Sequence, residues 1–268
     1  MTPLAQRVAT ACALASLWWN VALAQSDSQE LAKKLSNPIA SLISVPFQLN
    51  YDEGFGPDDG HRYLLNIQPV IPISISDDWN MIVRVILPVI SQNDVFGDSG
   101  SDDGLGDTVA SLFFSPKQAG PSGLIWGVGP VFSLPTATED TLGSEKWGIG
   151  PTAVALRQGG PWTYGVLANH LWSVAGDDDR ADFSSTFLQP FVSYTTATAW
   201  TTALNTEASY DWKAEEWSVP INLSVSKLLT AGNQPISVGG GLRWWADSPP
   251  GGPEGLGLRA FVTLLFPK

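Results

Sequence analysis

The sequence predicts an all-β protein: a single antiparallel transmembrane β-barrel of about twelve strands behind a short N-terminal helical or flexible leader. Three observations lead to this fold class. Apolar and polar residues alternate along strand-length segments over most of the chain. The connections between these segments alternate between short turns and longer acidic loops. Tryptophans gather near the ends of the segments, where a barrel meets the two membrane interfaces.

Composition narrows the function classes. The chain has 268 residues and a formal net charge of −12, so no nucleic-acid partner is expected, because phosphates would be repelled. Only 15% of the residues are charged, so the acids must be concentrated in part of the chain. Beyond residue 24, no apolar run reaches the length of about 18 residues that indicates a membrane-spanning helix.

Residues 1–24 have the features of a signal peptide. Arg7 precedes an apolar stretch that ends in Ala22-Leu23-Ala24, and the alternative is an N-terminal anchor helix. The single cysteine, Cys12, lies in this segment, so cleavage would leave no thiol for catalysis, disulfides or metal binding. An exported chain without disulfides suits the Gram-negative envelope, and we expect the bacterial outer membrane.

Residues 25–40 form the predicted periplasmic leader. Within it, "SQELAKKLSNP" places Leu31 and Leu35 four residues apart and ends at Pro38, which predicts a short helix. The sequence leaves two interpretations open. The helix is either a small plug at the periplasmic mouth of the barrel or part of a flexible leader.

Residues 41–268 form the predicted barrel, in which period-two alternation identifies the strands. In Tyr63–Ile90 the alternation stops at "SDDWN" and then restarts, which indicates a hairpin. A helix there would carry Pro69 and Pro72 in its interior, at about 3 kcal/mol each. The expected strands lie near residues 42–51, 62–75, 80–92, 105–115, 123–135, 146–157, 162–173, 185–195, 200–210, 217–227, 235–246 and 256–266.

The connections give the barrel its expected orientation. Short turns such as "SDDW" and "QGGPW" alternate with long loops such as "NDVFGDSGSDDG" and "AGDDDRADFS", which hold nearly all the acids. Outer-membrane barrels have short periplasmic turns and long outer loops. A soluble β-sandwich would also alternate, but it does not explain a polar inner face beside an apolar outer face on every strand.

Aromatic residues and prolines bear on this prediction in opposite ways. Trp79, Trp162 and Trp200 each follow a short turn and form the expected periplasmic belt, while a second group lies near the long loops: Trp147, Trp172, Trp212, Trp217 and Trp245.

Prolines inside strands remove ladder donors, so we expect bulges or breaks at Pro46, Pro69, Pro72, Pro88, Pro130, Pro190 and Pro220.

Strand parity also places a set of polar residues inside the barrel. An arginine facing lipid near the midplane costs about 2–4 kcal/mol, so inward placement is favoured. These side chains either line a narrow, selective pore or form an ion-pair network that fills the lumen, and strand number does not decide between the two. The lumen-lining candidates are Asn66, Gln68, Arg84, Asp107, Gln189, Asn205, Glu207, Asn222, Arg243 and Arg259.

Seven segments, in order, resemble one family over nearly the whole mature chain: "LSNPIASLISVPFQLNYD", "LNIQPVIPISIS", "WNMIVRVILPVI", "GLGDTVASLFFSP", "GVGPVFSLPTAT", "KWGIGPTAVAL" and "FLQPFVSY". The family consists of bacterial envelope proteins labelled transporter, neuromedin U or MetA-pathway of phenol degradation. The resemblance implies an outer-membrane, porin-like barrel with a role in uptake or efflux of small apolar or aromatic molecules. It carries no catalytic residues to transfer.

No catalytic residue, metal site or cofactor is expected, and the chain is predicted not to be an enzyme. His170 lies on the apolar parity beside Trp172, but Ser173 falls on the opposite face of the strand. A triad at His170 would need a partner from another strand, which leaves a lipid-acting barrel enzyme as one alternative and a soluble periplasmic β-protein as another. The "GDDDRAD" loop does not match a calcium-binding loop. The expected partners are membrane lipid, lipopolysaccharide and a small-molecule solute, and a monomer is favoured.

Overall fold

The computed structural model describes residues 27–96 and 100–267. The predicted signal peptide, residues 1–24, lies outside the described residues. The described chain forms a closed antiparallel barrel, because the first strand, β1 (Ile43–Phe55), pairs with the last, β15 (Leu256–Phe266). The predicted fold class is therefore confirmed.

Fifteen strand segments make up the barrel wall. Three pairs of segments, β2 with β3, β5 with β6 and β11 with β12, are each two parts of one strand, so the barrel has twelve strands, as predicted. The remaining segments are β2 (Gly60–Ile67), β3 (Val70–Ser74), β4 (Trp79–Asn93), β5 (Ser101–Leu105), β6 (Thr108–Pro116), β7 (Leu124–Leu134), β8 (Lys146–Gly159), β9 (Trp162–Gly176), β10 (Ser184–Thr195), β11 (Trp200–Thr206), β12 (Ala208–Asp211), β13 (Glu216–Ala231) and β14 (Gln234–Asp247).

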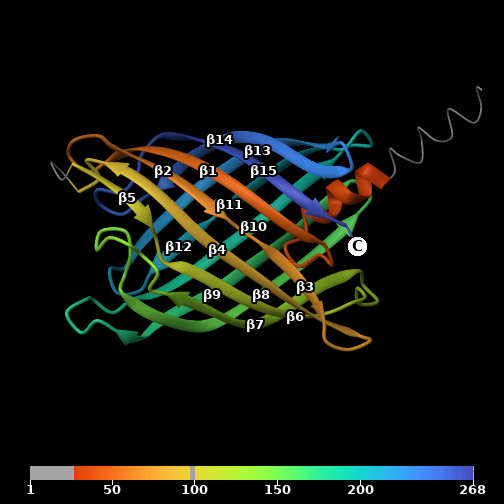
Figure 1. Ribbon diagram of the computed structural model, residues 1–268, viewed down its shortest axis with the longest axis horizontal. Coiled ribbons are helices and arrows are strands. Elements are labelled where there is room, and N and C mark those ends of the chain that lie inside the picture. Colours follow the sequence, from red (N-terminus) through yellow and green to blue (C-terminus); the bar gives the residue numbers. More distant parts are fainter. Residues whose placement is uncertain (1–26, 97–99, 268) are drawn as a thin grey trace, which may run out of the picture.

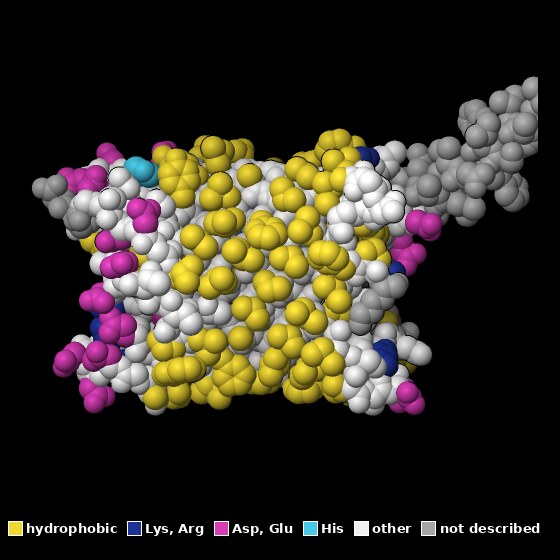
Figure 2. Space-filling view, in the orientation of Figure 1, with side chains coloured by type: hydrophobic (Ala, Val, Ile, Leu, Met, Phe, Trp, Pro, Cys, Tyr) yellow, Lys and Arg dark blue, Asp and Glu magenta, His cyan; other side chains and the backbone are white. Residues whose placement is uncertain are grey.

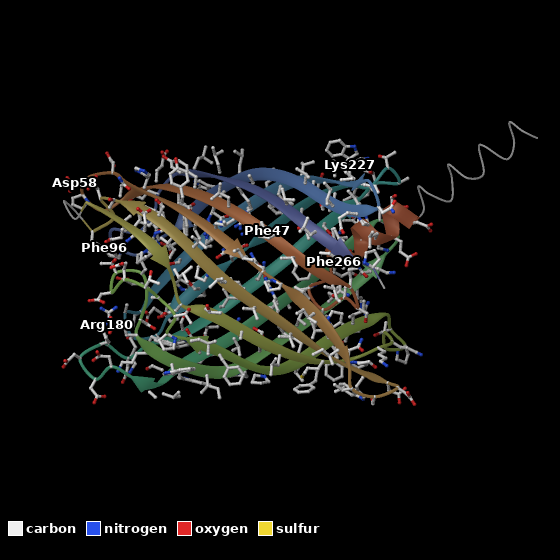
Figure 3. All side chains as sticks on the ribbon, viewed as in Figure 1. Phe47, Asp58, Phe96, Arg180, Lys227 and Phe266 are labelled. Carbon is white, nitrogen blue, oxygen red and sulfur yellow. The ribbon has the colours of Figure 1, made fainter. Side chains whose placement is uncertain are left out.

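The two ends of the barrel differ as predicted. All long connections lie at one end, whereas the leader helix, the C-terminus and the short turns lie at the other (Figure 1). Asp58, Phe96 and Arg180 mark the long-loop end, and Lys227 and Phe266 mark the short-turn end (Figure 3). β8 and β9 are joined by only two residues, Gly160 and Pro161.

The outer wall is apolar between its two polar ends. Figure 2 shows a continuous field of hydrophobic side chains across the middle of the barrel, with acidic side chains gathered mainly at the long-loop end. Leu223, Leu242 and Leu258 are half or more exposed on this wall. A surface of this size and apolarity is the kind that membrane barrels present to hydrocarbon. In residues 27–96 and 100–267, no helix combines the length and apolar character needed to cross a bilayer.

Tryptophans follow the expected belts with one correction. Trp79, Trp162 and Trp200 are exposed at the short-turn end, as the predicted belt requires. At the long-loop end, Trp147, Trp172, Trp212 and Trp217 are also exposed. Trp245 was expected in that outer belt, but its indole nitrogen donates to the buried Asp52 carboxylate at 2.8 Å, so it faces the lumen. Its neighbour Trp244, half exposed, faces outward instead.

Most of the strand prolines coincide with lapses in the ladder, but the break expected at Pro72 does not occur, because Pro72 stays in register with Ile82. The gap between β2 and β3 contains Pro69 and lies opposite Pro46, and the gap between β11 and β12 lies opposite Pro220. A β-bulge lies opposite Pro88. There, Leu87 and Pro88 of β4 face three residues, 106–108, between the pairs Val89–Leu105 and Ile86–Val109. A proline has no N–H to give to its neighbour, so pairing stops locally while the barrel stays closed.

Candidate functional site

Four charged side chains meet inside the barrel. Arg259 donates both of its terminal nitrogens to Glu207, at 3.0 and 2.7 Å, in a bidentate pair. Arg243 lies 3.3 Å from Asp52 and 3.6 Å from Glu207, measured between nitrogen and oxygen. All but Glu207 are buried, and Glu207 is largely so. Together with Arg84, described below, we call this group the arginine cluster.

Neutral side chains also contact the cluster, although Arg243 Nε is buried without a hydrogen-bond partner among the described residues. Asn50 Oδ1 accepts from Arg259 Nε at 2.7 Å, and the Arg243 guanidinium stacks 4.5 Å from the centre of the Trp245 ring. Buried ions are tolerated only when they are paired and hydrogen-bonded in this way. The cluster draws on β1, β4, β14, β15 and the break between β11 and β12, so it joins several strands rather than following one.

Arg84 differs from the other two arginines of the cluster. It lies on β4, directly opposite Val70 of β3 and Ser111 of β6, and donates to Gln68 Oε1 at 3.1 Å. No carboxylate of the described residues lies within ion-pairing distance of its guanidinium. Its side chain is half-buried and faces the lumen. Arg84 therefore carries a positive charge that the protein does not neutralise by direct contact.

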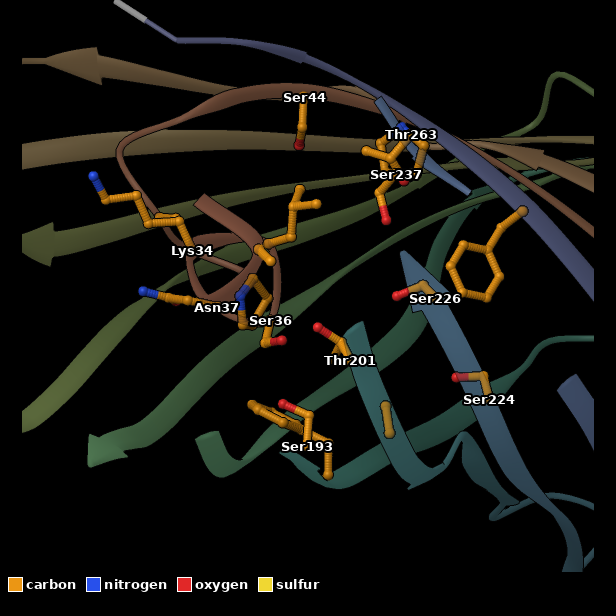
Figure 4. Close-up of a pocket in the computed structure, with 18 of the residues that line it drawn as sticks. Lys34, Ser36, Asn37, Ser44, Ser193, Thr201, Ser224, Ser226, Ser237 and Thr263 are labelled. Atoms are coloured by element: carbon orange, nitrogen blue, oxygen red, sulfur yellow. The ribbon is translucent and has the colours of Figure 1, made fainter. Parts of the chain in front are cut away.

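A cavity of about 290 Å³ lies between the arginine cluster and the leader. Hydroxyl groups of Ser193, Thr201, Ser226 and Ser237 surround it (Figure 4). Its basic lining residues are Lys34, Arg84 and Arg259, and no acidic residue of the described chain lines it. Its apolar lining residues include Val70, Phe191 and Phe261. The cavity therefore combines a positive end with apolar walls.

The leader covers the short-turn mouth of this cavity. Residues 27–35 are helical, and Leu31 and Leu35 pack against a buried cluster that contains Leu228 and Leu265 of the barrel wall. Gln29 donates to the Thr195 carbonyl at 3.2 Å, and Lys33 O accepts from Gln158 at 2.9 Å. The predicted helix is confirmed, and it is packed on the mouth of the barrel rather than extended away from it (Figure 1).

Beyond the helix, the leader reaches into the lumen. Ile39 is 4% exposed and lies in a cluster of inward-facing apolar side chains from four strands: Ile82, Phe113, Val154, Leu156 and Leu167. Sequence parity had described the inner face as polar, so this apolar inner wall was missed. The signal was present, because these residues have inward parity on their strands. The lumen is thus apolar on one side and charged on the other.

The ten lumen-lining candidates do not all lie in one place. Gln68, Arg84, Gln189, Asn205 and Arg259 line the cavity. Glu207 and Arg243 belong to the arginine cluster, and Asn222 donates to Asn205 at 2.8 Å. Asn66 is half-buried on β2 between Gln48 and Pro88, away from the cavity.

Asp107 is the exception among them. Its carboxylate accepts hydrogen bonds from Ala137 N and from Ser144 N and Oγ, at 3.2, 2.7 and 2.7 Å, so it anchors the loop of residues 135–145. Because the carboxylate accepts these hydrogen bonds from the loop, it is not available to line a pore. Asp52 was missed because the expected strand ended at residue 51, and Asn50, although on the polar face of that strand, was not among the candidates.

The long loops are tied to one another outside the lumen. Arg180 donates to the carbonyls of Asp140 and Gly143, at 2.8 and 2.5 Å. Asp182 accepts from Ser173 Oγ at 3.0 Å and lies 3.5 Å from Lys146. The Ser173 hydroxyl and the Lys146 charge lower the pKa of Asp182, so this contact persists into mildly acidic solution and is lost as the pH falls through the lowered value.

His170 takes part in a separate group of side chains on the outer wall. Its Nδ1 lies 2.7 Å from Thr186 Oγ1, and its Nε2 lies 3.3 Å from Ser184 Oγ on the neighbouring strand. Trp212 Nε1 donates to the same Thr186 oxygen at 2.8 Å. Ser184, on the neighbouring strand β10, therefore supplies the hydroxyl beside His170. Ser173 does not, because its hydroxyl donates to Asp182.

Within the described part of the chain, no group of three or more histidine, cysteine, aspartate or glutamate side chains could hold a metal ion. The acidic "GDDDRAD" loop is part of this described chain. The chemistry of the lumen therefore rests on its guanidinium, carboxylate, amide and apolar groups.

Comparison with known proteins supports the fold. No family model and no curated protein matches the sequence. Among solved structures, an outer membrane channel from Pseudomonas putida F1 is similar with a TM-score of 0.64 and 14% identity, over 84% of this chain and 94% of that one. Outer membrane phospholipase A from Escherichia coli has a TM-score of 0.50 and 9% identity, over 84% of this chain and 90% of that one. The chain has the fold of outer-membrane β-barrels.

Proposed function

We propose that this protein is a narrow channel of the bacterial outer membrane that binds small molecules in its lumen and passes them. The observation that carries the proposal is the cavity of about 290 Å³ inside a closed barrel, because a barrel that served only as a structural anchor would gain stability by filling it. The signal peptide, the lipid and lipopolysaccharide contacts and the monomeric state belong to the same proposal.

The leader covers one mouth of the barrel, so a solute can pass only when the leader is displaced. It is held at the mouth by few hydrogen bonds and by the packing of a few apolar side chains such as Leu31 and Leu35, so its displacement breaks far fewer contacts than opening the barrel wall. The apolar inner wall supports solutes with an apolar or aromatic part, which is also the class that the family resemblance implies.

Planar-bilayer conductance tests this function. The full-length protein should show small or infrequent openings, and a variant lacking residues 27–40 should show several-fold larger conductance, because the mouth is then uncovered. Asp58→Asn, in an exposed loop at the other end, is the matched control and should behave as the parent. A leaderless barrel that folds, as judged by heat-modifiable migration, yet conducts nothing would contradict the channel.

A second candidate function rests on the His170 group. Ser184 Oγ could attack a lipid ester carbonyl while His170 Nε2 takes its proton and passes it to the leaving alcohol, after which water releases the acyl group. Thr186 would accept the Nδ1–H and hold that tautomer. This candidate predicts labelling of the detergent-solubilised protein by a fluorophosphonate probe. Ser184→Ala should abolish labelling and Ser185→Ala, which faces the lumen, should not; an unlabelled parent excludes the enzyme.

A further inference from the structure

The sign of the charge changes between the whole chain and the cavity. The chain has a net charge of −12, yet the side chains lining the cavity include three cations and no acid of the described residues. Lys34 is paired with Glu30 at 3.0 Å, and Arg259 is held by Glu207. Arg84 has no carboxylate of the described residues within ion-pairing distance, so its guanidinium is free to pair directly with an incoming anion.

Polar groups lining the same cavity as Arg84 can contribute donors to an anion site. Gln68, Gln189 and Asn205 line the same cavity and present side-chain amides, whose N–H groups are donors. Ser193 also lines it, is 5% exposed, and its hydroxyl has no hydrogen-bond partner among the described residues. A buried hydroxyl without a partner is uncommon in proteins and indicates that a water or ligand completes it.

Apolar side chains line the cavity that contains this charge. Val70 is the cross-strand neighbour of Arg84, and Phe191 and Phe261 line the same cavity. Gly239 makes the position of Phe261 possible, because a Cβ at residue 239 would come within 2.5 Å of the Phe261 ring. An inorganic anion would leave these walls in contact with water, whereas a molecule with an apolar body would cover them.

We propose that the cavity binds small organic carboxylates with an apolar body, and that Arg84 holds the carboxylate. This inference rests on the proposed function and names the class of solute that the lumen takes. A guanidinium and a carboxylate match in a bidentate geometry, and a charge-assisted pair of this kind is stronger than a neutral hydrogen bond. The apolar body of the ligand packs on Val70, Phe191 and Phe261.

Equilibrium binding to the full, detergent-solubilised protein, measured by calorimetry, tests this proposal with benzoate, benzyl alcohol and acetate as probes. Benzoate should bind about tenfold or more tightly than benzyl alcohol, which lacks the charge, and than acetate, which lacks the body. Arg84→Gln should weaken benzoate about tenfold without affecting benzyl alcohol, and Arg84→Lys should restore part of the loss. Arg157→Gln, an exposed arginine on the outer wall, is the matched control and should change nothing.

Three results would overturn the proposal: equal affinity for benzoate and benzyl alcohol, full benzoate binding by Arg84→Gln, or competition by chloride at the same concentration as benzoate. Phe261→Leu gives a second variant, which should weaken benzoate and leave acetate unchanged. Heat-modifiable migration establishes that each variant has folded. Conductance without carboxylate binding contradicts this proposal alone, and carboxylate binding without conductance contradicts the channel alone.

Discussion

Glu207 balances the charges of the lumen. It forms the bidentate pair with Arg259 and lies 3.6 Å from Arg243, so one carboxylate serves two guanidinium groups. It is also the single residue between β11 and β12, opposite Pro220, where the ladder lapses. The local break and the ion pair therefore coincide at one residue.

Replacing this carboxylate should destabilise the barrel. Glu207→Gln leaves Arg259 without its ionic partner, and loss of one member of a buried pair costs about 3–5 kcal/mol. The free energy of unfolding in urea, measured in lipid or detergent, should fall by an amount of that order. Glu139→Gln, in an exposed loop, should leave it unchanged. If the two variants are equally stable, the cluster does not contribute to stability.

Single residues also show where strand alternation was enough to predict the position of a side chain and where it was not. Parity placed Arg84, Arg243 and Arg259 inside, and the structure has all three there. It also placed Asp107 inside, but not the loop that its carboxylate binds, and Trp245, expected in the outer belt, faces inward and bonds to Asp52. Which partner an inward side chain meets depends on neighbouring strands, and one strand's pattern does not contain that information.

At the scale of elements, prolines interrupt pairing without opening the barrel. Each expected strand survives as an element, and the three divided strands are divided at or opposite a proline. The sequence predicted breaks at seven prolines but not which of the paired strands would be divided, because a break appears on whichever neighbour lacks the donated N–H. Which strand is that neighbour depends on how the strands pair.

Pro220 provides a test of this account. Pro220→Val restores an N–H opposite Glu207, and pairing should then continue from β11 into β12. Hydrogen exchange should show a protected amide at residue 220 and slower exchange in its neighbours, with a net gain in stability of about 1 kcal/mol at most. Ile221→Val, on the outer face of the same strand, is the control. An unprotected amide at residue 220 would mean that another feature causes the lapse.

The leader shows how one element depends on the whole. Its helix was predictable from the spacing of Leu31 and Leu35 and from Pro38. Its position was not, because Ile39 and Leu35 pack on residues from strands throughout the barrel. An apolar side chain signals that it will be buried, but not against which surface.

At the scale of the whole molecule, the wall of the barrel is apolar on its outer surface, and the arginine cluster lies inside. This arrangement predicts a position-dependent response to charge. Leu223→Arg, at a half-exposed position in the middle of β13, should cost about 2–4 kcal/mol in a bilayer. The same substitution at Asp58, in a loop, should cost little. Measurement of unfolding in liposomes checks the difference, and equal costs would argue against a lipid-facing wall.

The sequence by itself determined the strand number, the outward and inward faces, the two unlike ends and the leader helix. Each of these follows from order within one short segment, where period, proline and charge are visible. The tertiary structure decided which charges pair, where the cavity lies, which inner wall is apolar and what Trp245 and Asp107 contact. Asn50 and Arg259 meet although 209 residues separate them, because barrel closure brings the first strand beside the last. Contacts of that kind depend on register between strands, and that register is set only when the barrel closes.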